Sequence, residues 1–185
     1  MPFLRQPSVI IITGVMAAGK STVAQLLAEK FERGVHLRGD SFRRMIVKGR
    51  EEMLPDASTE AERQLSLRYH LSAATARGYA EAGFDVVWQD VILGPSLLEI
   101  TQMLNDLPVF VVVLNPSETA ISTREQTRNK NGYGVWTIQE LNRRLNDETP
   151  RIGLWLDTSD LSPEETVEEI WKGIWDEGRI RQSQQ

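Results

Sequence analysis

The stretch Gly14-Val15-Met16-Ala17-Ala18-Gly19-Lys20-Ser21 decides the fold of this chain. It matches the pattern G-x-x-x-x-G-K-[ST] of a phosphate-binding loop, the Walker A motif, at every fixed position. The β-branched run 9–13 before it predicts a buried parallel strand, and the amphipathic segment 20–31 after it predicts a helix. The alternative, a glycine turn that precedes a lysine by chance, does not explain this strand–loop–helix context. The sequence therefore predicts a phosphate-binding loop.

The residue types in the loop indicate what it binds. The glycines allow backbone N–H groups and a helix N-terminus to surround an anion. Lys20 is expected to reach the β- and γ-phosphates of a nucleotide, and Ser21 is expected to ligate Mg²⁺. The expected cofactors are therefore ATP and Mg²⁺. The residues predicted to bind the nucleotide are Gly14, Val15, Met16, Ala17, Ala18, Gly19, Lys20, Ser21 and Thr22.

Length and composition narrow the class of protein. The chain has 185 residues, which suits a single domain over residues 1–185. It has no cysteine, which excludes disulfides and thiolate metal sites and favours a cytoplasmic protein. No signal peptide or membrane-spanning run is visible. The net charge of −5 disfavours non-specific binding to nucleic acid or anionic lipid, so phosphate binding has to be local.

Apolar strand-like runs alternate with helical patterns along the chain, which predicts an α/β fold with a parallel sheet and helices on both faces. Helix starts are expected near Thr59, Thr137 and Ser162. In the last helix, Trp171 and Trp175 share the apolar face, so they are expected to cover the sheet rather than bind a ligand. The predicted strands are 9–13, 35–38, 84–88, 109–114 and 152–156.

Ligands of open parallel sheets bind beyond the carboxyl ends of the strands, and Asp40 follows the second predicted strand. A carboxylate there can take the proton of an attacking hydroxyl as a general base, or hold a Mg²⁺-bound water. The alternative is that Asp40 only caps the helix that begins near Ser41. Arg43 and Arg44 follow at once, either as binders of an anionic acceptor or as ordinary surface residues.

The third predicted strand ends in Gln89-Asp90. Asp90 is predicted to orient Mg²⁺ through water or to contact the acceptor, and the alternative is that it caps a turn before Gly94. Gln89 is uncharged, so it could hydrogen-bond a substrate but could not act as a base.

A helix after the fourth predicted strand carries Arg124 and Arg128, which are four residues apart and share a face. Phosphoryl transfer needs positive charge near the γ-phosphate, so these arginines are predicted catalytic residues on a lid of about residues 124–137. The alternative is a solvated basic face with Glu118 and Glu125 as partners.

Four segments resemble the chloramphenicol phosphotransferase-like P-loop kinases, within the group that includes shikimate, gluconate and adenylate kinases. The resemblance implies a three-layer α/β/α fold with a five-stranded sheet of order 2-3-1-4-5, ATP on the loop, Asp40 as the base and Arg124 and Arg128 on the lid. It also places residues 157–160 near the adenine. The family often shows two acidic residues where this chain has Gln89-Asp90. The segments are 14–21, 39–41, 90–94 and 124–128.

The sequence thus predicts a small-molecule kinase that transfers the γ-phosphoryl group of ATP to an acceptor hydroxyl. The acceptor is expected to lie against the helical region 41–82, whose candidate lining residues are Arg63, Arg68, Tyr69, His70 and Arg77. The residues predicted to bind it directly are Asp40, Arg43, Arg44, Gln89 and Asp90. Two alternatives stay open: a 5′-hydroxyl polynucleotide kinase, and a nucleotide-dependent switch that makes no phosphorylated product.

Overall fold

A single five-stranded parallel sheet organises the chain, with strand order β2-β3-β1-β4-β5. The computed structural model describes residues 6–127 and 135–180. The central strand β1 pairs with both neighbours, so that Ile11 lies between Trp88 and Val111. This is the order that the family resemblance implied. The strands are β1 (Val9–Thr13), β2 (Gly34–Arg38), β3 (Asp85–Gln89), β4 (Val109–Leu114) and β5 (Leu154–Leu156).

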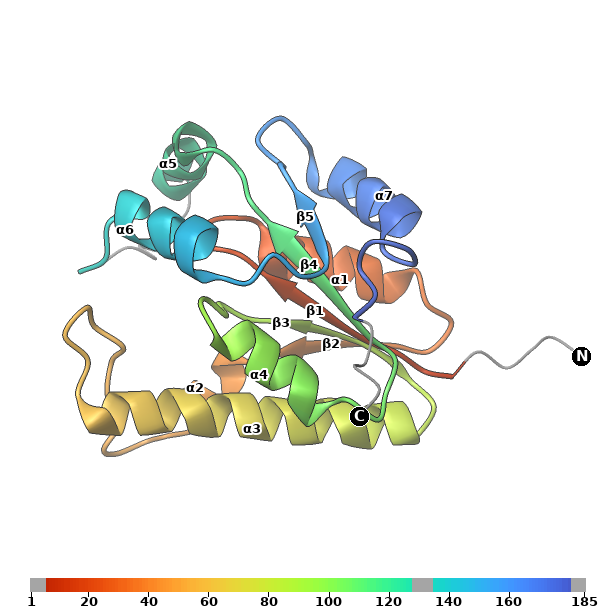
Figure 1. Ribbon diagram of the computed structural model, residues 1–185, viewed down its shortest axis with the longest axis horizontal. Coiled ribbons are helices and arrows are strands. Elements are labelled where there is room, and N and C mark those ends of the chain that lie inside the picture. Colours follow the sequence, from red (N-terminus) through yellow and green to blue (C-terminus); the bar gives the residue numbers. More distant parts are fainter. Residues whose placement is uncertain (1–5, 128–134, 181–185) are drawn as a thin grey trace, which may run out of the picture.

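Helices cover both faces of the sheet (Figure 1). One face carries α1 (Lys20–Glu29) and α7 (Pro163–Gly173), which pack against each other, and the other carries α3 (Thr59–Glu81) and α4 (Ser96–Met103). The short helices lie near the carboxyl ends of the strands (Figure 1). They are α2 (Asp40–Arg44), α5 (Glu118–Thr127), α6 (Ile138–Arg143) and the π-helix η1 (Arg144–Glu148). The predicted three-layer α/β/α fold is confirmed.

Aromatic rings join α1, α7 and β4 on one face of the sheet. Trp175 lies edge-on to Phe110 and Trp171, with ring centroids 5.3 and 5.4 Å apart. Phe31 packs edge-on against Trp171 at 5.3 Å. The two tryptophans are therefore part of the packing beside the sheet, as the spacing predicted, but Trp175 lies in the turn after α7, which ends at Gly173, and not in the helix itself.

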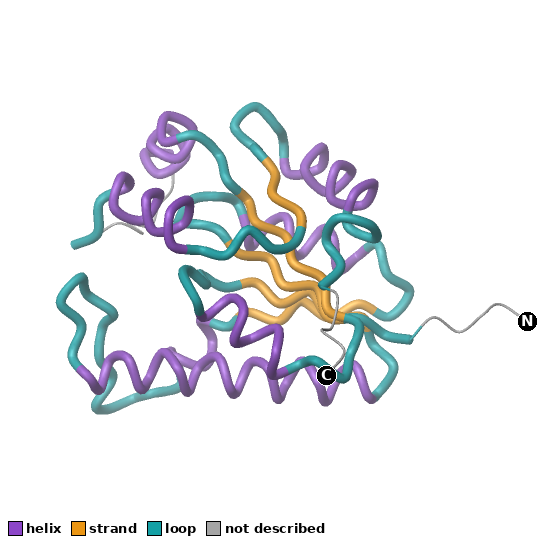
Figure 2. Tube along the Cα trace, viewed as in Figure 1, coloured by secondary structure: helices purple, strands orange, loops and turns teal. Residues whose placement is uncertain are grey.

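The predicted element boundaries hold to within a few residues. Both capping boxes are present, at Thr137 before α6 and at Ser162 before α7. The strand predicted from residue 152 begins only at Leu154, because Gly153 has a φ of +76°, which extended strands do not adopt. Figure 2 shows this short strand at the edge of the sheet. Among the described helices, none is both long and apolar enough to cross a membrane.

Candidate active site

The phosphate-loop motif forms a tight turn between β1 and α1. Gly14 has a φ of +149°, and a Cβ on it would lie 2.5 Å from the carbonyl oxygen of Leu114 in β4. Gly19 has a φ of +93° and is the N-cap residue of α1, so the motif glycines meet real backbone requirements. Ala17 also has a positive φ, +61°, which is a strained conformation for a residue with a side chain. The loop is thus held in one shape by the sheet behind it.

Lys20 folds back over this turn. Its Nζ donates hydrogen bonds to the carbonyl oxygens of Gly14, at 2.9 Å, and Val15, at 2.7 Å. The residue is 8% exposed. The next two residues, Ser21 and Thr22, are exposed in the first turn of α1, and that turn contains no acidic residue. Positive charge from the lysine and from the helix N-terminus therefore gathers at the loop.

The remaining motif residues serve the packing below the turn. Val15, Ala17 and Ala18 are buried, and Met16 is half-buried against the core. Thr13, at the end of β1, exchanges two hydrogen bonds with Ile92, donating to its carbonyl oxygen at 2.8 Å and accepting from its N–H at 2.9 Å. These bonds tie the loop to the segment that follows β3.

Asp40 is the first residue of α2, directly beyond the end of β2. Its carboxylate accepts a hydrogen bond from Arg44 Nε at 2.7 Å and lies 3.5 Å from a terminal guanidinium nitrogen of Arg43. The N-cap residue of α2 is Gly39, and no side chain caps the helix. The alternative that Asp40 only caps this helix is therefore wrong. Arg43 also pairs with Glu52, so both arginines have carboxylate partners on the protein itself.

Asp90 lies in a different environment, because it is buried and held by Arg68 of α3. Nε of Arg68 donates to one carboxylate oxygen of Asp90 at 2.9 Å, and a terminal nitrogen donates to the other oxygen. The N–H of Val91 donates to Asp90 at 2.8 Å. Burial raises the pKa of the Asp90 carboxyl, and the charge of Arg68 opposes that rise. Burial favours a neutral Arg68, but the Asp90 charge and hydrogen bonds raise the pKa of Arg68, so the guanidinium stays charged.

Gly39 precedes Asp40 in the chain and packs against the side chain of Asp90. A Cβ on Gly39 would lie 1.9 Å from a carboxylate oxygen of Asp90 and 3.1 Å from Nε1 of Trp88. The φ of Gly39 is −59°, so glycine is needed here for space and not for its backbone conformation. Within the described residues, the buried Trp88 Nε1 has no hydrogen-bond partner. The buried carboxylate of Asp90 thus packs directly against the residue that precedes Asp40.

Some of the other predicted side chains lie buried at this site, and the rest lie on the surface away from it. Gln89 is buried at the end of β3, next to Asp90. Tyr69 is also buried, and its hydroxyl donates to the carbonyl oxygen of Val91 at 2.9 Å. Arg63 and His70 are exposed on α3, and Arg77 pairs instead with Asp106. Of the candidates on α3, the structure brings Arg68 and Tyr69 to the strand ends.

Arg124 lies in α5, on the β5 side of the sheet. Its guanidinium donates to the carbonyl oxygens of Thr158 and, at 3.3 Å, Ser159. Asp157 accepts a hydrogen bond from the Ser159 N–H at 2.9 Å, which orders the same loop. The structure therefore places Arg124 against the segment that the family resemblance assigned to the adenine. Arg128 lies outside the described residues.

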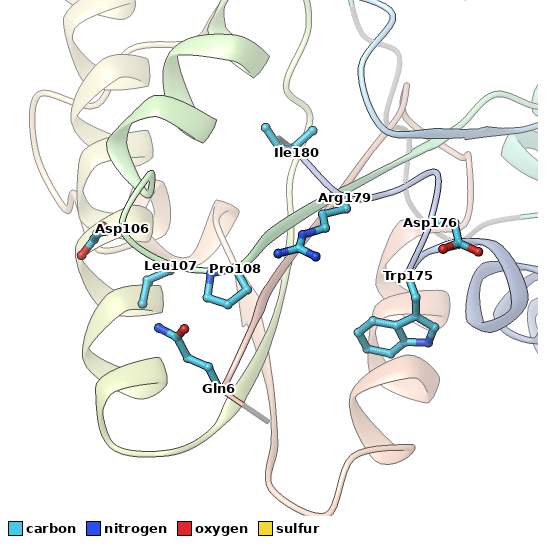
Figure 3. Close-up of a pocket in the computed structure, with 8 residues that line it drawn as sticks. All are labelled: Gln6, Asp106, Leu107, Pro108, Trp175, Asp176, Arg179 and Ile180. Carbon is cyan, nitrogen blue, oxygen red and sulfur yellow. The ribbon is translucent and has the colours of Figure 1, made fainter. Parts of the chain in front are cut away.

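A hollow of about 600 Å³ lies at the opposite end of the sheet, beside the amino ends of β1 and β4. Figure 3 shows its side chains, among them Pro108, Trp175 and Arg179. None of the phosphate-loop residues lines it. The chemistry-bearing residues gather instead at the carboxyl ends of β1, β2 and β3.

Trp136 lies within the range predicted as the lid but was not named as a site residue, and its side chain joins that range to the segment between α2 and α3. Its indole Nε1 donates a hydrogen bond of 2.8 Å to the carbonyl oxygen of Met53. A backbone carbonyl carries no signal in the side-chain pattern, so this contact could not be read from the sequence. The pairing of Arg68 with Asp90 was missed for a similar reason, since sequence shows neither the rotation of α3 nor its distance from β3.

A family model described as an AAA domain matches residues 9–144. A search of curated proteins found no match. Solved structures share the fold at low sequence identity. The APS kinase of Mycobacterium tuberculosis, in complex with AMPPNP and APS, is 18% identical, with a TM-score of 0.68 over 90% of this chain and 96% of that one. A gluconokinase from Sinorhizobium meliloti is 19% identical, with a TM-score of 0.63 over 91% and 92%.

A third structure, the tunicamycin resistance protein of Deinococcus radiodurans, is 19% identical. Its TM-score is 0.63, over 92% of this chain and 97% of that one. At these identities the likeness shows a common fold. The architecture described above is therefore shared with proteins named for different substrates.

Proposed function

This chain belongs to the AAA domain family, and we propose that it is an ATP-dependent small-molecule kinase that phosphorylates an acceptor hydroxyl. The observation that carries the proposal is the position of Asp40, a carboxylate at the same edge of the sheet as a complete phosphate loop. Nucleotide binding alone would not require it. We take residues 1–185 as one domain, with an acceptor-binding region at 41–82 and a lid at about 124–137.

The phosphate loop would hold the nucleotide. Backbone N–H groups of residues 14–22 and the N-terminus of α1 would surround the phosphates. Lys20 would exchange its bonds to the Gly14 and Val15 carbonyl oxygens for bonds to the β- and γ-phosphates. These carbonyls keep the ammonium group at the loop before the nucleotide binds.

The donor set fits a Mg²⁺ ion that arrives with the nucleotide. In the part of the chain that the structure describes, no group of three or more histidine or acidic side chains could form a protein-only metal site. Mg²⁺ takes many of its ligands from phosphate oxygens and water. The exposed Ser21 hydroxyl would supply one direct ligand, and Asp90, whose oxygens accept bonds from Arg68, would act through a water. When bound, the ion would offset charge on the phosphates.

Asp40 would act as the general base. Its carboxylate would take the proton of the acceptor hydroxyl while that oxygen forms a bond to the γ-phosphorus. The bond from the γ-phosphorus to the β,γ-bridging oxygen breaks, and ADP leaves with that bonding pair. Arg43 and Arg44 keep the carboxylate at the strand end and have further donors for an acceptor. Gln89 would add a hydrogen bond from the floor of the site.

Positive charge near the leaving group would come from the lid. Arg124 and Arg128 are the residues we assign to this role. Arg124 rests on the carbonyl oxygens of Thr158 and Ser159, so it would have to exchange these bonds for a phosphate. Exchanging two neutral acceptors for a charged one is favourable, because hydrogen bonds to charged groups are stronger.

The test is ADP release from Mg-ATP with pools of hydroxylated sugars, nucleosides, cyclitols and antibiotics, followed by detection of the phosphorylated compound. Asp40→Asn is expected to bind Mg-ADP like the wild type and lose at least about 100-fold in turnover. Asp176→Asn, which alters an exposed carboxylate at the opposite end of the sheet, is the matched control. If ATP binds and no pool or 5′-hydroxyl oligonucleotide raises the rate, the switch becomes the better assignment.

A further inference from the structure

Trp136 and Met53 are 83 positions apart in the sequence, yet they are joined by the hydrogen bond from the indole Nε1 to the Met53 carbonyl oxygen. Trp136 directly precedes Thr137, the N-cap residue of α6. Met53 lies in the segment 45–58 between α2 and α3, which we call the acceptor loop. In Figure 2 this loop rises toward the segment before α6, at the side of the molecule where the strands end. The bond therefore joins the proposed lid to the proposed acceptor-binding region.

Several contacts fix the position of Trp136 at the start of α6. The Thr137 hydroxyl accepts a bond from the Glu140 N–H at 3.1 Å, and Glu140 accepts one from the Thr137 N–H at 2.9 Å. The guanidinium of Arg144 lies over the Trp136 ring, 5.1 Å from its centroid. Trp136 also packs against the core. Trp136, at the α6 end of the proposed lid, therefore has a fixed position against which a more exposed segment can be held.

The acceptor loop has little packing of its own. No residue of 45–58 is buried, and Val47 is 97% exposed. Polar contacts hold it to α3, where the Gln64 side chain bonds to the Glu51 N–H at 2.9 Å and to the Gly49 carbonyl oxygen at 2.8 Å. In a loop with so few contacts, one additional hydrogen bond contributes strongly to fixing the conformation.

The loop leads directly to the proposed base. Glu52, the neighbour of Met53, pairs with Arg43, and Arg43 lies 3.5 Å from the Asp40 carboxylate. Trp136 is thus connected to Asp40 through the Met53–Glu52 backbone and two ion pairs. A movement of the loop away from Trp136 would release Arg43 from Glu52 and change what surrounds Asp40.

From these contacts we infer that Trp136 is a positioning residue for the acceptor, an inference that rests on the proposed kinase function. It fixes the acceptor loop, and through Glu52 and Arg43 the Asp40 side of the site, without touching the phosphate loop. Loss of its hydrogen bond should weaken acceptor binding and leave nucleotide binding unchanged.

The first measurement needs no acceptor. Trypsin is expected to cut the loop after the exposed Lys48 and Arg50, and mass spectrometry identifies the fragments. Trp136→Phe keeps a ring and removes the donor, so cleavage at these sites should become roughly three- to tenfold faster. Trp155→Phe is the matched control, because Trp155 Nε1 also donates to a backbone carbonyl, that of Ile152 at 3.1 Å, and lies beneath an arginine. Equal cleavage in wild type and Trp136→Phe would overturn the inference.

The second measurement uses the acceptor that the phosphotransfer screen identifies. Trp136→Phe should raise the KM for that acceptor about threefold to tenfold and leave the KM for ATP within about twofold, and Trp136→Ala should have a larger effect in the same direction. Equal changes in both KM values would mean a general loss of structure and would refute the positioning role. If no acceptor is found, the proposed function fails, and the trypsin result still decides whether Trp136 fixes the loop.

Discussion

Arg68 and Asp90 form a buried ion pair with two hydrogen bonds, directly beneath the glycine that precedes Asp40. Their side chains are 12% and 2% exposed. A buried pair of this kind adds little stability relative to an apolar pair, but removal of one partner leaves an uncompensated charge. The pair therefore fixes the buried residues beneath Gly39, and substitution of Arg68 or Asp90 should disturb the candidate site.

Arg68→Ala is expected to lower the free energy of unfolding by about 3–5 kcal/mol, because the Asp90 carboxylate would remain buried without its partner. Urea denaturation measures this loss. Arg77→Ala is the control on the same helix, since Arg77 pairs with Asp106 at the surface and its loss should cost at most about 1 kcal/mol. Similar losses in both variants would mean that the Arg68–Asp90 pair is solvated.

Gly39→Ala should displace Asp90 or α2, because the new Cβ would meet a carboxylate oxygen at 1.9 Å. We expect a loss of about 1–3 kcal/mol in stability and a larger relative loss in phosphotransfer. Gly78→Ala is the control, since a Cβ there meets no atom within 4 Å and alanine favours the helix by about 0.5–1 kcal/mol. A fully active, stable Gly39→Ala protein would show that the Asp90 carboxylate does not need its present place.

Lys20→Ala is expected to weaken Mg-ADP binding by about 10- to 100-fold, because it removes charge-assisted hydrogen bonds to phosphate. Isothermal titration calorimetry measures the affinity. Lys30→Ala, at the other end of α1, removes a lysine that pairs with Glu168 at the surface and should leave the affinity unchanged. Unchanged binding in Lys20→Ala would exclude the loop lysine from nucleotide binding.

Stability should fall between pH 6.5 and pH 4 in part because of His36. Burial, together with the charge of Arg38, lowers the pKa of His36 from 6.5 to about 4. Its Nδ1 lies 2.9 Å from Gln25 Oε1, and its buried Nε2 has no partner within the described residues. The unfolded chain therefore binds a proton more readily than the folded protein in this range, so acidification favours unfolding.

His36→Gln is expected to remove this part of the pH dependence, about 1–2 kcal/mol after allowance for partial exposure. Urea denaturation at several pH values measures it, and His70→Gln on the outer side of α3 controls for loss of a histidine. The same pH slope in His36→Gln as in the wild type would contradict the prediction.

The phosphate loop and the strands could be predicted because their signals are local, whereas the strand order was implied only by the family resemblance. Gly14 and Gly19 require particular backbone conformations, and β1 is a continuous apolar run. The strand-end positions of Asp40 and Asp90 followed from the same reasoning, and the structure places both there. Their different surroundings could not be predicted, because burial depends on how α3 packs.

Contacts between segments that are far apart in the sequence could not be predicted from the sequence pattern. The bond from Trp136 to Met53 involves a main-chain oxygen, and the partner of Asp90 is 22 positions away on a helix. Arg124 was predicted from its spacing to Arg128, but spacing within a helix does not show that its guanidinium rests on the loop after β5. The roles of these residues stay predictions until the variants are measured.

Because the sheet fixes Gly14 through its close approach to Leu114, the anion-binding turn is already assembled before a ligand arrives. Ordering a flexible segment costs about 1–2 kcal/mol per residue, and here folding of the core has met that cost in advance. Nucleotide association should therefore carry a small entropy penalty. The exposed acceptor loop, residues 45–58, is not supported by the sheet in this way. Sequence change can therefore accumulate in it without disturbing the phosphate loop. The architecture thus lets the phosphate-donor half stay constant while the acceptor half diverges.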